Sequence, residues 1–482
     1  MRTRIWAGFG AALLLALSGC DTGGSGGSGG TALTYPSPPP DEKLFDVASM
    51  QDESAWTTTN AHDPSIIKTG DGTYYVVSTD VKVGGAPTPG VMIRKSKDLI
   101  HWEWVGRAFD GVPEDAGAWT GGPTLWAPDV EKFGDTYYLY YSSSTFGSNT
   151  SYIGVATSSS MEGPWTDRGE VIKTGAGDAP NAIDPNVVID AEGEPWFVYG
   201  SFFDGIHIAP LDPATGKLKE PGFGKRIAAR DSKTESGAVE GPYLIYKPEL
   251  KKYYLFVSYD SLSSDYNVRV GRSDSIEGPY LDYNGRDLTD TAYDPPFDVG
   301  TKILGGYKFG DSDGWVAPGH NSILQDGEND YIVHHARPES DSNWMYLHVR
   351  KLLWTSDGWP VVSPERYAGE SVQRIPESAI AGDWERIVQL RWIDGQAESE
   401  PLKLLKDGRI DSEGLSGAWT FDGDHTLTLS WDDPNGTSTQ EKVLLLPAWD
   451  WELNRPTIVF TGLDGDGQAV WGKKLLTNVP AD

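Results

Sequence analysis

Residues 63–78 read DPSIIKTGDGTYYVVS, and this stretch decides the fold. A polar residue leads a short apolar strand, an Asp-Gly turn follows, and a second strand is rich in tyrosine and valine. Two such runs around a tight turn are typical of a β-hairpin. The same order occurs five times along the chain, and the leading polar residues are Asp63, Asp129, Asp184, Glu240 and His320.

The five copies lie roughly 55 to 80 residues apart, which leaves room for several strands in each. Residues 158–165 (SSSMEGPW) match residues 273–280 (SDSIEGPY), and residues 96–102 are a looser copy, so we expect a third strand in each repeat. Repeats of this size are typical of propeller blades. The sequence predicts an all-β fold with a five-bladed β-propeller over residues 46–373, and a solenoid of β-repeats is the alternative.

The segment after residue 373 does not follow the repeat, and its expected strands and turns are spaced differently. Short strands are expected at residues 382–388 (GDWERIV) and 469–472 (AVWG), and Asp-Gly and Pro-Asn-Gly turns lie between them. We interpret residues 374–482 as a small C-terminal β-barrel or sandwich domain. Carbohydrate binding and structural support of the propeller are both compatible with this domain.

Residues 1–20 resemble a lipoprotein signal peptide. An apolar run at residues 5–17 is too short to span a bilayer, and it ends in the lipobox-like LSGC. Cys20 is the only cysteine, so we expect it to carry the lipid that anchors a secreted chain to a bacterial membrane, at the cell surface or facing the periplasm. An ordinary signal peptide is the alternative. Residues 21–45 are rich in Gly, Ser and Pro, which predicts a tether.

Charge and aromatic content limit the possible partners. The formal net charge of −30 repels nucleic acids and acidic polysaccharides, so we expect no nucleic-acid partner and a neutral ligand. The chain contains 19 Trp, 22 Tyr and 14 Phe, whose flat faces suit stacking on sugar rings. We expect a monomer.

The leading residue of each repeat is also where we expect the chemistry. The first strand of each propeller blade lines the central channel, so the five leading residues should form a ring at its mouth. Hydrolysis of a glycosidic bond needs two carboxyl groups, and crowding raises the pKa of one of them. Glu240 has the longest reach and suits the proton donor, but the pattern leaves the choice of base open. A purely structural polar ring is the alternative.

Five short motifs in the repeats resemble those of a known enzyme family. They contain NAHDPSII (60–67), LWAPDV (125–130), NAIDPN (181–186), AVEGPY (238–243) and PGHNS (318–322). These stretches resemble the endo-1,5-α-L-arabinanases of glycoside hydrolase family 43 over most of residues 55–370. The resemblance implies a five-bladed propeller and inverting cleavage of internal α-1,5 bonds in arabinan, a neutral side chain of pectin.

The resemblance also implies roles for individual residues. By position, Asp63 is similar to the general base, Glu240 to the general acid, and Asp184 to the carboxylate that tunes the acid's pKa and orients it. A calcium ion, or sodium, is implied near His320, held by that histidine and by waters. Calcium prefers oxygen ligands, so a hydrogen-bonded channel histidine is the alternative. His334 and His335 are adjacent on a strand and face opposite sides, so we do not expect them to form a metal pair.

Sugar contacts are implied at seven positions, namely Trp126, Phe146, Gly147, Asn181, Ser201, Phe202 and Phe203. Many arabinanases have Trp where Phe203 stands, which leaves the subsite preference open. Two other functions remain as alternatives: an exo-acting α-L-arabinofuranosidase or β-xylosidase of the same family, and a non-catalytic arabinan-binding lipoprotein. A retaining fructan-type enzyme would show an Asn-Asp-Pro-Asn-Gly context, which the sequence around Asp63 lacks.

Overall fold

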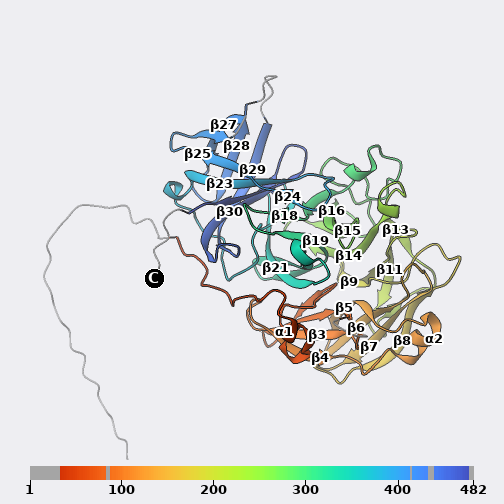
Figure 1. The fold of residues 1–482 in the computed structure, drawn as a ribbon. Helices are drawn as coiled ribbons and strands as arrows, with labels where there is room; N and C mark the ends of the chain where they lie inside the picture. The colour runs from red at the N-terminus through yellow and green to blue at the C-terminus, as the bar shows by residue number, and fades with distance from the viewer. Residues whose placement is uncertain (1–32, 83–86, 413–414, 433–438, 477–482) are drawn as a thin grey trace, which may run out of the picture. The chain divides into compact units, whose positions relative to one another are not determined.

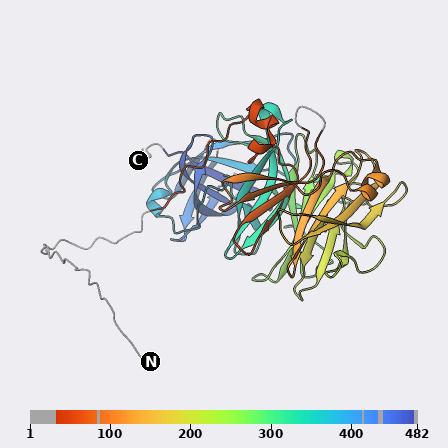
Figure 2. The same ribbon diagram turned by 90° about the horizontal axis from the view of Figure 1, so that it is seen from below.

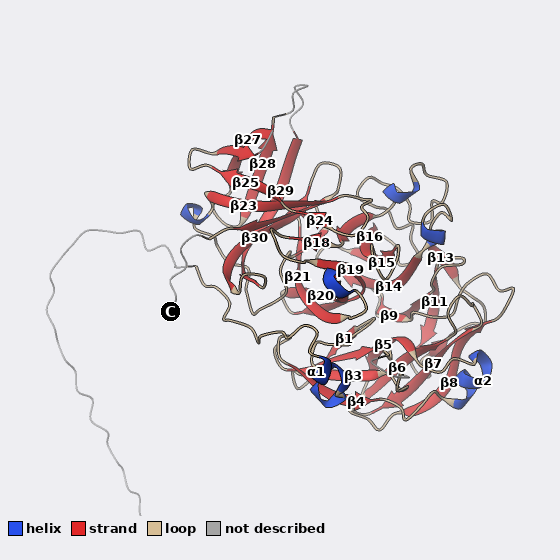
Figure 3. Cartoon of the chain, viewed as in Figure 1, coloured by secondary structure: helices blue, strands red, loops and turns tan. Residues whose placement is uncertain are grey.

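The computed structural model describes residues 33–82, 87–412, 415–432 and 439–476. Most of its regular structure is β-strand (Figure 3). The described helical segments are short, and they are α1 (Val47–Gln51), α2 (Glu114–Thr120), η1 (Glu53–Ala55), η2 (Glu235–Gly237), η3 (Pro296–Asp298), η4 (Glu339–Asp341) and η5 (Glu377–Ala379). None of these helices is long and apolar enough to cross a membrane. The predicted signal peptide and Cys20 lie outside the described residues.

Five antiparallel sheets form the blades of a β-propeller in chain order (Figure 1). Blade one contains β1 (Ser65–Lys68), β2 (Tyr74–Ser78), β3 (Met92–Ser96) and β4 (Trp102–Arg107). Blade two contains β5 (Trp126–Phe133), β6 (Thr136–Ser143), β7 (Ser151–Ser158) and β8 (Thr166–Thr174). Blade three contains β9 (Asn186–Ile189), β10 (Pro195–Tyr199), β11 (Ile206–Asp212), β12 (Lys217–Leu218) and β13 (Lys225–Ala228).

Blade four contains β14 (Val239–Lys247), β15 (Lys252–Tyr259), β16 (Asn267–Ser273) and β17 (Thr301–Leu304). Blade five contains β18 (Tyr307–Lys308), β19 (Trp315–Asp326), β20 (Asn329–Pro338), β21 (Tyr346–Trp354) and β22 (Pro360–Val362). The strands β1, β5, β9, β14 and β19 contact one another in turn, and β19 contacts β1 again. These contacts close a ring around a channel, which excludes an open solenoid.

Eight later strands close into a barrel in the order β23-β25-β26-β27-β28-β29-β30-β31, drawn in blue in Figure 2. They are β23 (Gly382–Gln389), β25 (Glu400–Leu404), β26 (Arg409–Ser412), β27 (Leu415–Phe421), β28 (Thr426–Trp431), β29 (Thr439–Asp450), β30 (Arg455–Leu463) and β31 (Ala469–Lys474). The predicted all-β fold is therefore confirmed, and the small second domain is a barrel and not a sandwich.

The motif that we predicted as a third strand is instead a turn. β7 ends at Ser158 and β16 ends at Ser273, so residues 158–165 and 273–280 lie after the third strand of their blades. Gly163 and Gly278 have positive φ values of 81° and 78°, which glycine adopts without strain. The Gly-Pro pairs therefore mark the reversal of the chain after the third strand.

Backbone pairing also joins blade one to blade five. The Asn60 N–H donates to Met345 O at 2.8 Å, and the Leu347 N–H donates to Thr58 O at 2.7 Å. Thr59 and Tyr346 form an antiparallel bridge between these bonds. The segment that precedes Asp63 is thereby fixed on the edge of β21, which holds the first site residue against the last blade.

The predicted tether over residues 21–45 is wrong for its C-terminal part. Leu33 and Tyr35 pack against the barrel core, and Thr34 exchanges two hydrogen bonds with the Gln373 side chain, at 2.9 and 2.8 Å. Glu42 forms an ion pair with Arg366. Composition suggested a flexible linker because it carries no information on what a Pro-rich segment packs against.

The barrel is joined to the propeller by hydrogen bonds and by a shared core. The short strand β24 (Ala397–Glu398), which lies between β23 and β25 in sequence, pairs in parallel with β18 of blade five. The Lys302 ammonium of blade four donates to Leu390 O at 2.9 Å. Trp471 of the barrel belongs to the same hydrophobic cluster as Tyr307 and other residues of blades four and five.

Candidate active site

Three predicted site residues share one local backbone geometry. Asp63, Asp184 and His320 have positive φ values of 50°, 59° and 47°, which costs about 1 kcal/mol or more for a residue other than glycine. The N–H of each donates to a side chain on the second strand of the preceding blade. The acceptors are His335 Nδ1 at 3.3 Å, Ser142 Oγ at 3.0 Å and Ser258 Oγ at 2.8 Å, respectively. This repeated geometry places the three side chains at equivalent positions around the channel.

Asp129 does not belong to this ring, so the prediction of five equivalent residues is wrong at this position. It is 2 % exposed and accepts hydrogen bonds from Ser65 Oγ at 2.5 Å and from the Val187 N–H at 2.7 Å. Ser65 of β1 and Val187 of β9 follow Asp63 and Asp184 in the chain, so Asp129 lies deeper in the channel. Burial raises the pKa of Asp129 to about 7. The sequence does contain a sign of this difference, because proline precedes Asp129 (Pro128-Asp129) but follows Asp63 (Asp63-Pro64).

Asp63 lies among polar and imidazole groups. Its Oδ2 atom accepts a hydrogen bond from Thr79 Oγ1 at 2.6 Å and lies 2.8 Å from His62 Nδ1. Its Oδ1 atom lies 3.1 Å from His320 Nδ1. Burial alone would raise the pKa of Asp63, but His320 and His62 hold it well below its usual range. Asp63 is therefore ionised, as a general base must be.

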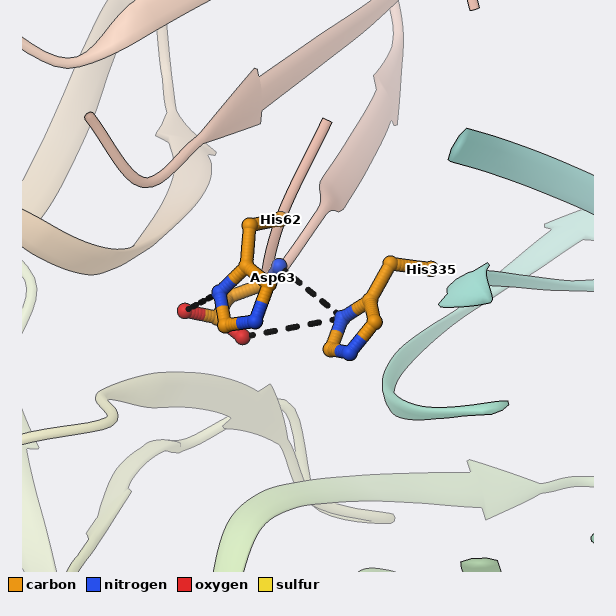
Figure 4. A group of neighbouring side chains, drawn as sticks. All are labelled: His62, Asp63 and His335. Atoms are coloured by element: carbon orange, nitrogen blue, oxygen red, sulfur yellow. Dashed lines mark hydrogen bonds and ion pairs between the residues drawn. The ribbon is translucent and has the colours of Figure 1, made fainter. Parts of the chain in front are cut away.

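His335 completes the surroundings of Asp63, and Figure 4 shows it beside His62. Its Nδ1 atom accepts the Asp63 N–H and lies 3.7 Å from Oδ1, too far for a hydrogen bond to the carboxylate. Burial holds the pKa of His335 well below its usual value, so the ring is neutral. His334, its neighbour, points to Arg350 instead, and Arg350 Nε donates to it at 3.2 Å. The two histidines face opposite sides, as predicted.

Glu240 and Asp184 form the other half of the site. Asp184 Oδ2 accepts the Gly241 N–H at 3.1 Å, which joins it to the backbone next to Glu240. Burial and then the charges of Glu240 and Asp63 raise the pKa of Asp184 well above its usual range. The like-charge effect expected for this ring therefore acts on Asp184. Glu240 is half-buried and accepts hydrogen bonds from Ser201 Oγ and Tyr266 Oη, both at 2.8 Å.

Known proteins match the chain over both domains. Residues 57–360 match glycosyl hydrolases family 43, and residues 364–472 match a C-terminal lipocalin-like domain. The chain belongs to glycosyl hydrolases family 43. It is therefore a glycoside hydrolase, and the inverting mechanism is typical of the family.

Relatives of this family 43 enzyme match it over different shares of its length. An extracellular endo-α-(1→5)-L-arabinanase of Thermotoga petrophila is 34% identical over 88% of this chain and 95% of the relative. The crystal structure of endo-1,5-α-L-arabinanase from Thermotoga petrophila RKU-1 has a TM-score of 0.79 at 33% identity, covering 87% of this chain and 99% of that one. An extracellular exo-α-(1→5)-L-arabinofuranosidase of Cellvibrio japonicus is 34% identical over 66% of this chain and 90% of the relative.

Two aromatic side chains among the expected sugar contacts of the family 43 enzyme are available for stacking. Phe146, beside Gly147 in the turn between β6 and β7, is 91% exposed, and Phe203 in the turn between β10 and β11 is 56% exposed. Phe202 and Trp126 are half-buried. Exposed aromatic faces at two loops of neighbouring blades suit contacts with successive sugar rings.

The two polar residues among the expected sugar contacts have protein partners. Asn181 is buried, and its Oδ1 atom accepts a hydrogen bond from Ser151 Oγ at 2.6 Å. Ser201 donates to Glu240. The structure thus brings Ser201 to Glu240, and it also brings Tyr266 there, which sequence reasoning missed. Tyr266 lies in an irregular loop outside the repeat motif, so no spacing could have pointed to it.

The described residues around His320 fit a cation that keeps bound waters, and they do not provide a complete set of protein oxygen ligands. Calcium prefers oxygen ligands. Two groups of ligand atoms converge within 4.8 Å among the described residues, and the one that contacts His320 consists of His62, Asp63 and His335. Beside His320, both amide atoms of Asn321 and the hydroxyl of Ser322 are buried without a partner among the described residues. Buried polar atoms of this kind need water or an ion. A cation here would rely on waters in addition to His320.

Proposed function

We propose that this family 43 glycoside hydrolase cleaves internal α-1,5-L-arabinofuranosidic bonds of arabinan, with inversion. One arrangement carries the proposal: Asp63, Asp184 and Glu240 lie on the inner strands or just before them around one channel, and Asp184 Oδ2 accepts the Gly241 N–H beside Glu240 at 3.1 Å. Inverting hydrolysis needs an ionised carboxylate and a carboxylic acid at one site. The substrate is supported by the Thermotoga relative, which matches over both domains.

Each carboxyl group has one role in the proposed reaction. Asp63 takes a proton from water while the water oxygen bonds to the anomeric carbon. Glu240 gives its proton to the glycosidic oxygen as the bond to the leaving sugar breaks. The lowered pKa of Asp63 keeps its carboxyl group ionised, and the half-buried position of Glu240 lets substrate reach it.

Asp184 acts on the acid and not on the sugar. Its carboxyl group holds the Gly241 N–H, so it fixes the backbone that carries Glu240. Burial and the charges of Glu240 and Asp63 raise the pKa of Asp184, which favours its protonated form beside the acid. This arrangement supports its role as the residue that orients and tunes Glu240.

Endo and exo action are distinguished by products. The exposed Phe146 and Phe203 support an open groove, whereas the Cellvibrio relative is named as an exo enzyme. We expect debranched linear arabinan to give a spread of oligosaccharides early in the reaction, with little activity on nitrophenyl arabinofuranoside. Arabinose or one short oligomer from the first minutes would instead favour the exo enzyme. The absence of product from both substrates would contradict the proposed activity.

A calcium or sodium ion near His320 is part of the proposal. His320 would supply one nitrogen ligand, and the unpartnered groups of Asn321 and Ser322 support a hydrated site beside it. When bound, the ion would supply positive charge to the catalytic centre. Elemental analysis of the purified protein, together with a thermal shift on adding calcium, tests this role; H320A should lose both signals, and unchanged signals would contradict it.

We also propose secretion followed by lipid anchoring at Cys20. Two relatives are named as extracellular, which supports secretion. The anchor rests on the LSGC sequence alone. Metabolic labelling with a palmitate analogue should mark the wild-type chain in the membrane fraction and leave a C20A variant unlabelled. Labelling of C20A, or no labelling of either chain, would contradict the anchor.

A further inference from the structure

The two carboxyl oxygens of Glu240 have different partners. Oε1 accepts the phenol O–H of Tyr266 at 2.8 Å, and Oε2 accepts the hydroxyl of Ser201 at 2.8 Å. A general acid carries one proton, so the two oxygens cannot serve equally in its transfer. The surroundings of Tyr266 and Ser201 indicate which oxygen gives the proton.

Tyr266 is a fixed donor. It is 1 % exposed, and burial together with the charges of Glu240, Asp63 and Asp184 raises its pKa well above the usual value. The phenol therefore keeps its proton throughout the working pH range. A phenol that keeps its proton and points at a carboxyl oxygen leaves that oxygen as an acceptor.

The ring of Tyr266 is held from several sides. A Cβ on Gly319 would lie 2.2 Å from its Cδ1 atom, so glycine at that position leaves the space that the ring fills. His335 stacks on the ring with centroids 5.8 Å apart and an interplanar angle of 18°. The Tyr266 N–H donates to Ser261 O at 2.8 Å, which fixes the loop before β16.

The stacked rings of Tyr266 and His335 continue to Asp63, the proposed base. His335 also stacks on His62, with centroids 4.1 Å apart and an angle of 20°, and His62 Nδ1 lies 2.8 Å from Asp63 Oδ2. Three planar rings therefore connect the carboxylate of Asp63 to the phenol on Glu240. The position of Tyr266 is set by packing and does not depend on substrate.

Ser201 differs from Tyr266 because its hydroxyl can rotate. A serine hydroxyl accepts as well as donates, so it can accept a proton held on Oε2 and later donate to the carboxylate that remains. The turn that carries Ser201 is tied to the strand of Glu240, since the Phe202 N–H donates to Val239 O at 2.8 Å. The next residue, Phe203, is exposed and marks the side open to a glycan.

We propose that Tyr266 is a positioning residue that occupies Oε1 of Glu240, so that Oε2 carries the proton given to the leaving oxygen. The inference rests on the proposed role of Glu240 as general acid. In the step, the Oε2–H bond breaks, the proton joins the glycosidic oxygen, and the bond from that oxygen to the anomeric carbon breaks. The Ser201 hydroxyl then donates to Oε2, and the Tyr266 proton stays on the phenol.

The first test compares Y266F with Y259F on two substrates. Tyr259 is a matched control, because its buried hydroxyl in the same blade has no hydrogen-bond partner among the described residues. We expect Y266F to lower kcat on linear arabinan about 10- to 100-fold, part of the full effect of general acid catalysis, with little change in KM. On nitrophenyl arabinofuranoside, whose leaving group needs little protonation, the loss should be less than about threefold.

The pH dependence of kcat distinguishes a positioning role of Tyr266 from a purely structural one. Donation from Tyr266 favours the ionised carboxylate, so its removal should keep the proton on the acid to higher pH. We expect the alkaline limb of kcat on arabinan to move to higher pH in Y266F and to stay in place in Y259F. Equal losses on both substrates, or an unmoved limb, would overturn the inference.

Two further variants, S201A and E240A, test the roles of the Glu240 carboxyl oxygens separately. If Y266F does not fold, S201A tests the assignment of Oε2, because loss of its hydroxyl should again reduce activity selectively on arabinan. Equal losses on both substrates would contradict it. E240A separates this inference from the function on which it rests: if E240A keeps full arabinan activity, the acid assignment itself fails. If E240A fails selectively on arabinan while Y266F resembles Y259F, only the role of Tyr266 fails.

Discussion

At the scale of single residues, the immediate neighbours of a carboxyl group decide its role. Asp63, just before β1, and Asp129, within β5, are both buried aspartates, yet their pKa values move in opposite directions. His62 and His320 lie within 3.1 Å of the Asp63 carboxylate and lower its pKa, whereas the partners of Asp129 include Ser65 and the Val187 N–H, and burial dominates. Asp63 and Asp184 of the proposed reaction differ in the same way, because the pKa of Asp63 is lowered and that of Asp184 is raised.

Substitution of the two proposed catalytic residues should give different substrate patterns. We expect E240A to lower kcat on arabinan by about 100- to 10,000-fold and to lose far less on nitrophenyl arabinofuranoside. D63A should lose activity on both substrates, because the attacking water needs a base in either case. Initial rates on the two substrates check this result, with D326A as a carboxylate control because Asp326 pairs with Lys68 at the C-terminal ends of β19 and β1. A uniform loss in E240A would contradict its role as acid.

At the scale of elements, blade five contains a buried histidine pair that links stability to pH. His334 and His348 are fully buried, with ring centroids 5.4 Å apart. Burial and Arg350 lower the pKa of His334 to about 3, and burial also holds the pKa of His348 well below its usual value. Neither His348 nitrogen has a hydrogen-bond partner among the described residues. Blade five therefore folds with both rings neutral.

The sign of this linkage is fixed by the depressed pKa values. The unfolded chain binds protons on these histidines below pH ~6.5, whereas the folded chain does not, so stability falls as pH decreases from that value. Each histidine contributes about 1.4 kcal/mol per pH unit to that loss. Between pH 6.5 and 5, H348L should lose about 2 kcal/mol less than the wild type, measured by denaturant unfolding at both pH values. Equal losses in the two proteins would contradict the prediction.

The N-terminal segment is a second element whose contribution is testable. Glu42 pairs with Arg366, whose guanidinium also stacks on Trp451 with 4.0 Å between its Cζ atom and the ring centroid. Removing one partner of a buried pair leaves an uncompensated charge, so E42A should lower the free energy of unfolding by about 3 kcal/mol. The neighbouring exposed residue gives the control, because D41A should change it by less than about 0.5 kcal/mol. Equal effects in a denaturation series would contradict this role.

At the scale of the whole molecule, Lys473 forms ion pairs with carboxylates at the junction between propeller and barrel. Lys473 of β31 lies 3.0 Å from Glu365, which follows the last propeller strand, and 3.2 and 2.7 Å from Asp450 and Glu452 of the barrel. The lysine is 2% exposed. The pKa of Glu365 is raised well above its usual value by burial and by Glu452, so this junction is short of positive charge.

Removing that lysine should weaken the junction in a pH-dependent way. K473M leaves buried carboxyls without a cation, and we expect it to lower the free energy of unfolding by about 3–5 kcal/mol at neutral pH. A carboxyl with a raised pKa destabilises the fold as pH rises, so part of the loss should be recovered near pH 5. Thermal unfolding at the two pH values checks this, with K403M at a half-exposed position as control. A loss that does not depend on pH would contradict the explanation.

The sequence by itself determined the features that repeat. Hairpin turns such as Asp71-Gly72, the five first strands and the polar residues at Asp63, Asp184 and Glu240 follow from local patterns, and local patterns are present in every copy. The change of rhythm after residue 373 likewise indicated a second β domain. These features depend on interactions between residues that are near one another in the chain, so they can be read without the fold.

Only the tertiary structure decided what depends on register and on distant contacts. Asp129 lies deeper than the ring because its carboxylate is hydrogen-bonded to Ser65 and Val187, which follow Asp63 and Asp184 in the chain, and a shift of one or two residues changes where a side chain points. Tyr266 reaches Glu240 from an irregular loop, and Ser201 contacts the acid across a blade boundary. The segment from Leu33 packs on a barrel that comes hundreds of residues later. Such contacts are made by packing between blades and domains, which no local pattern encodes.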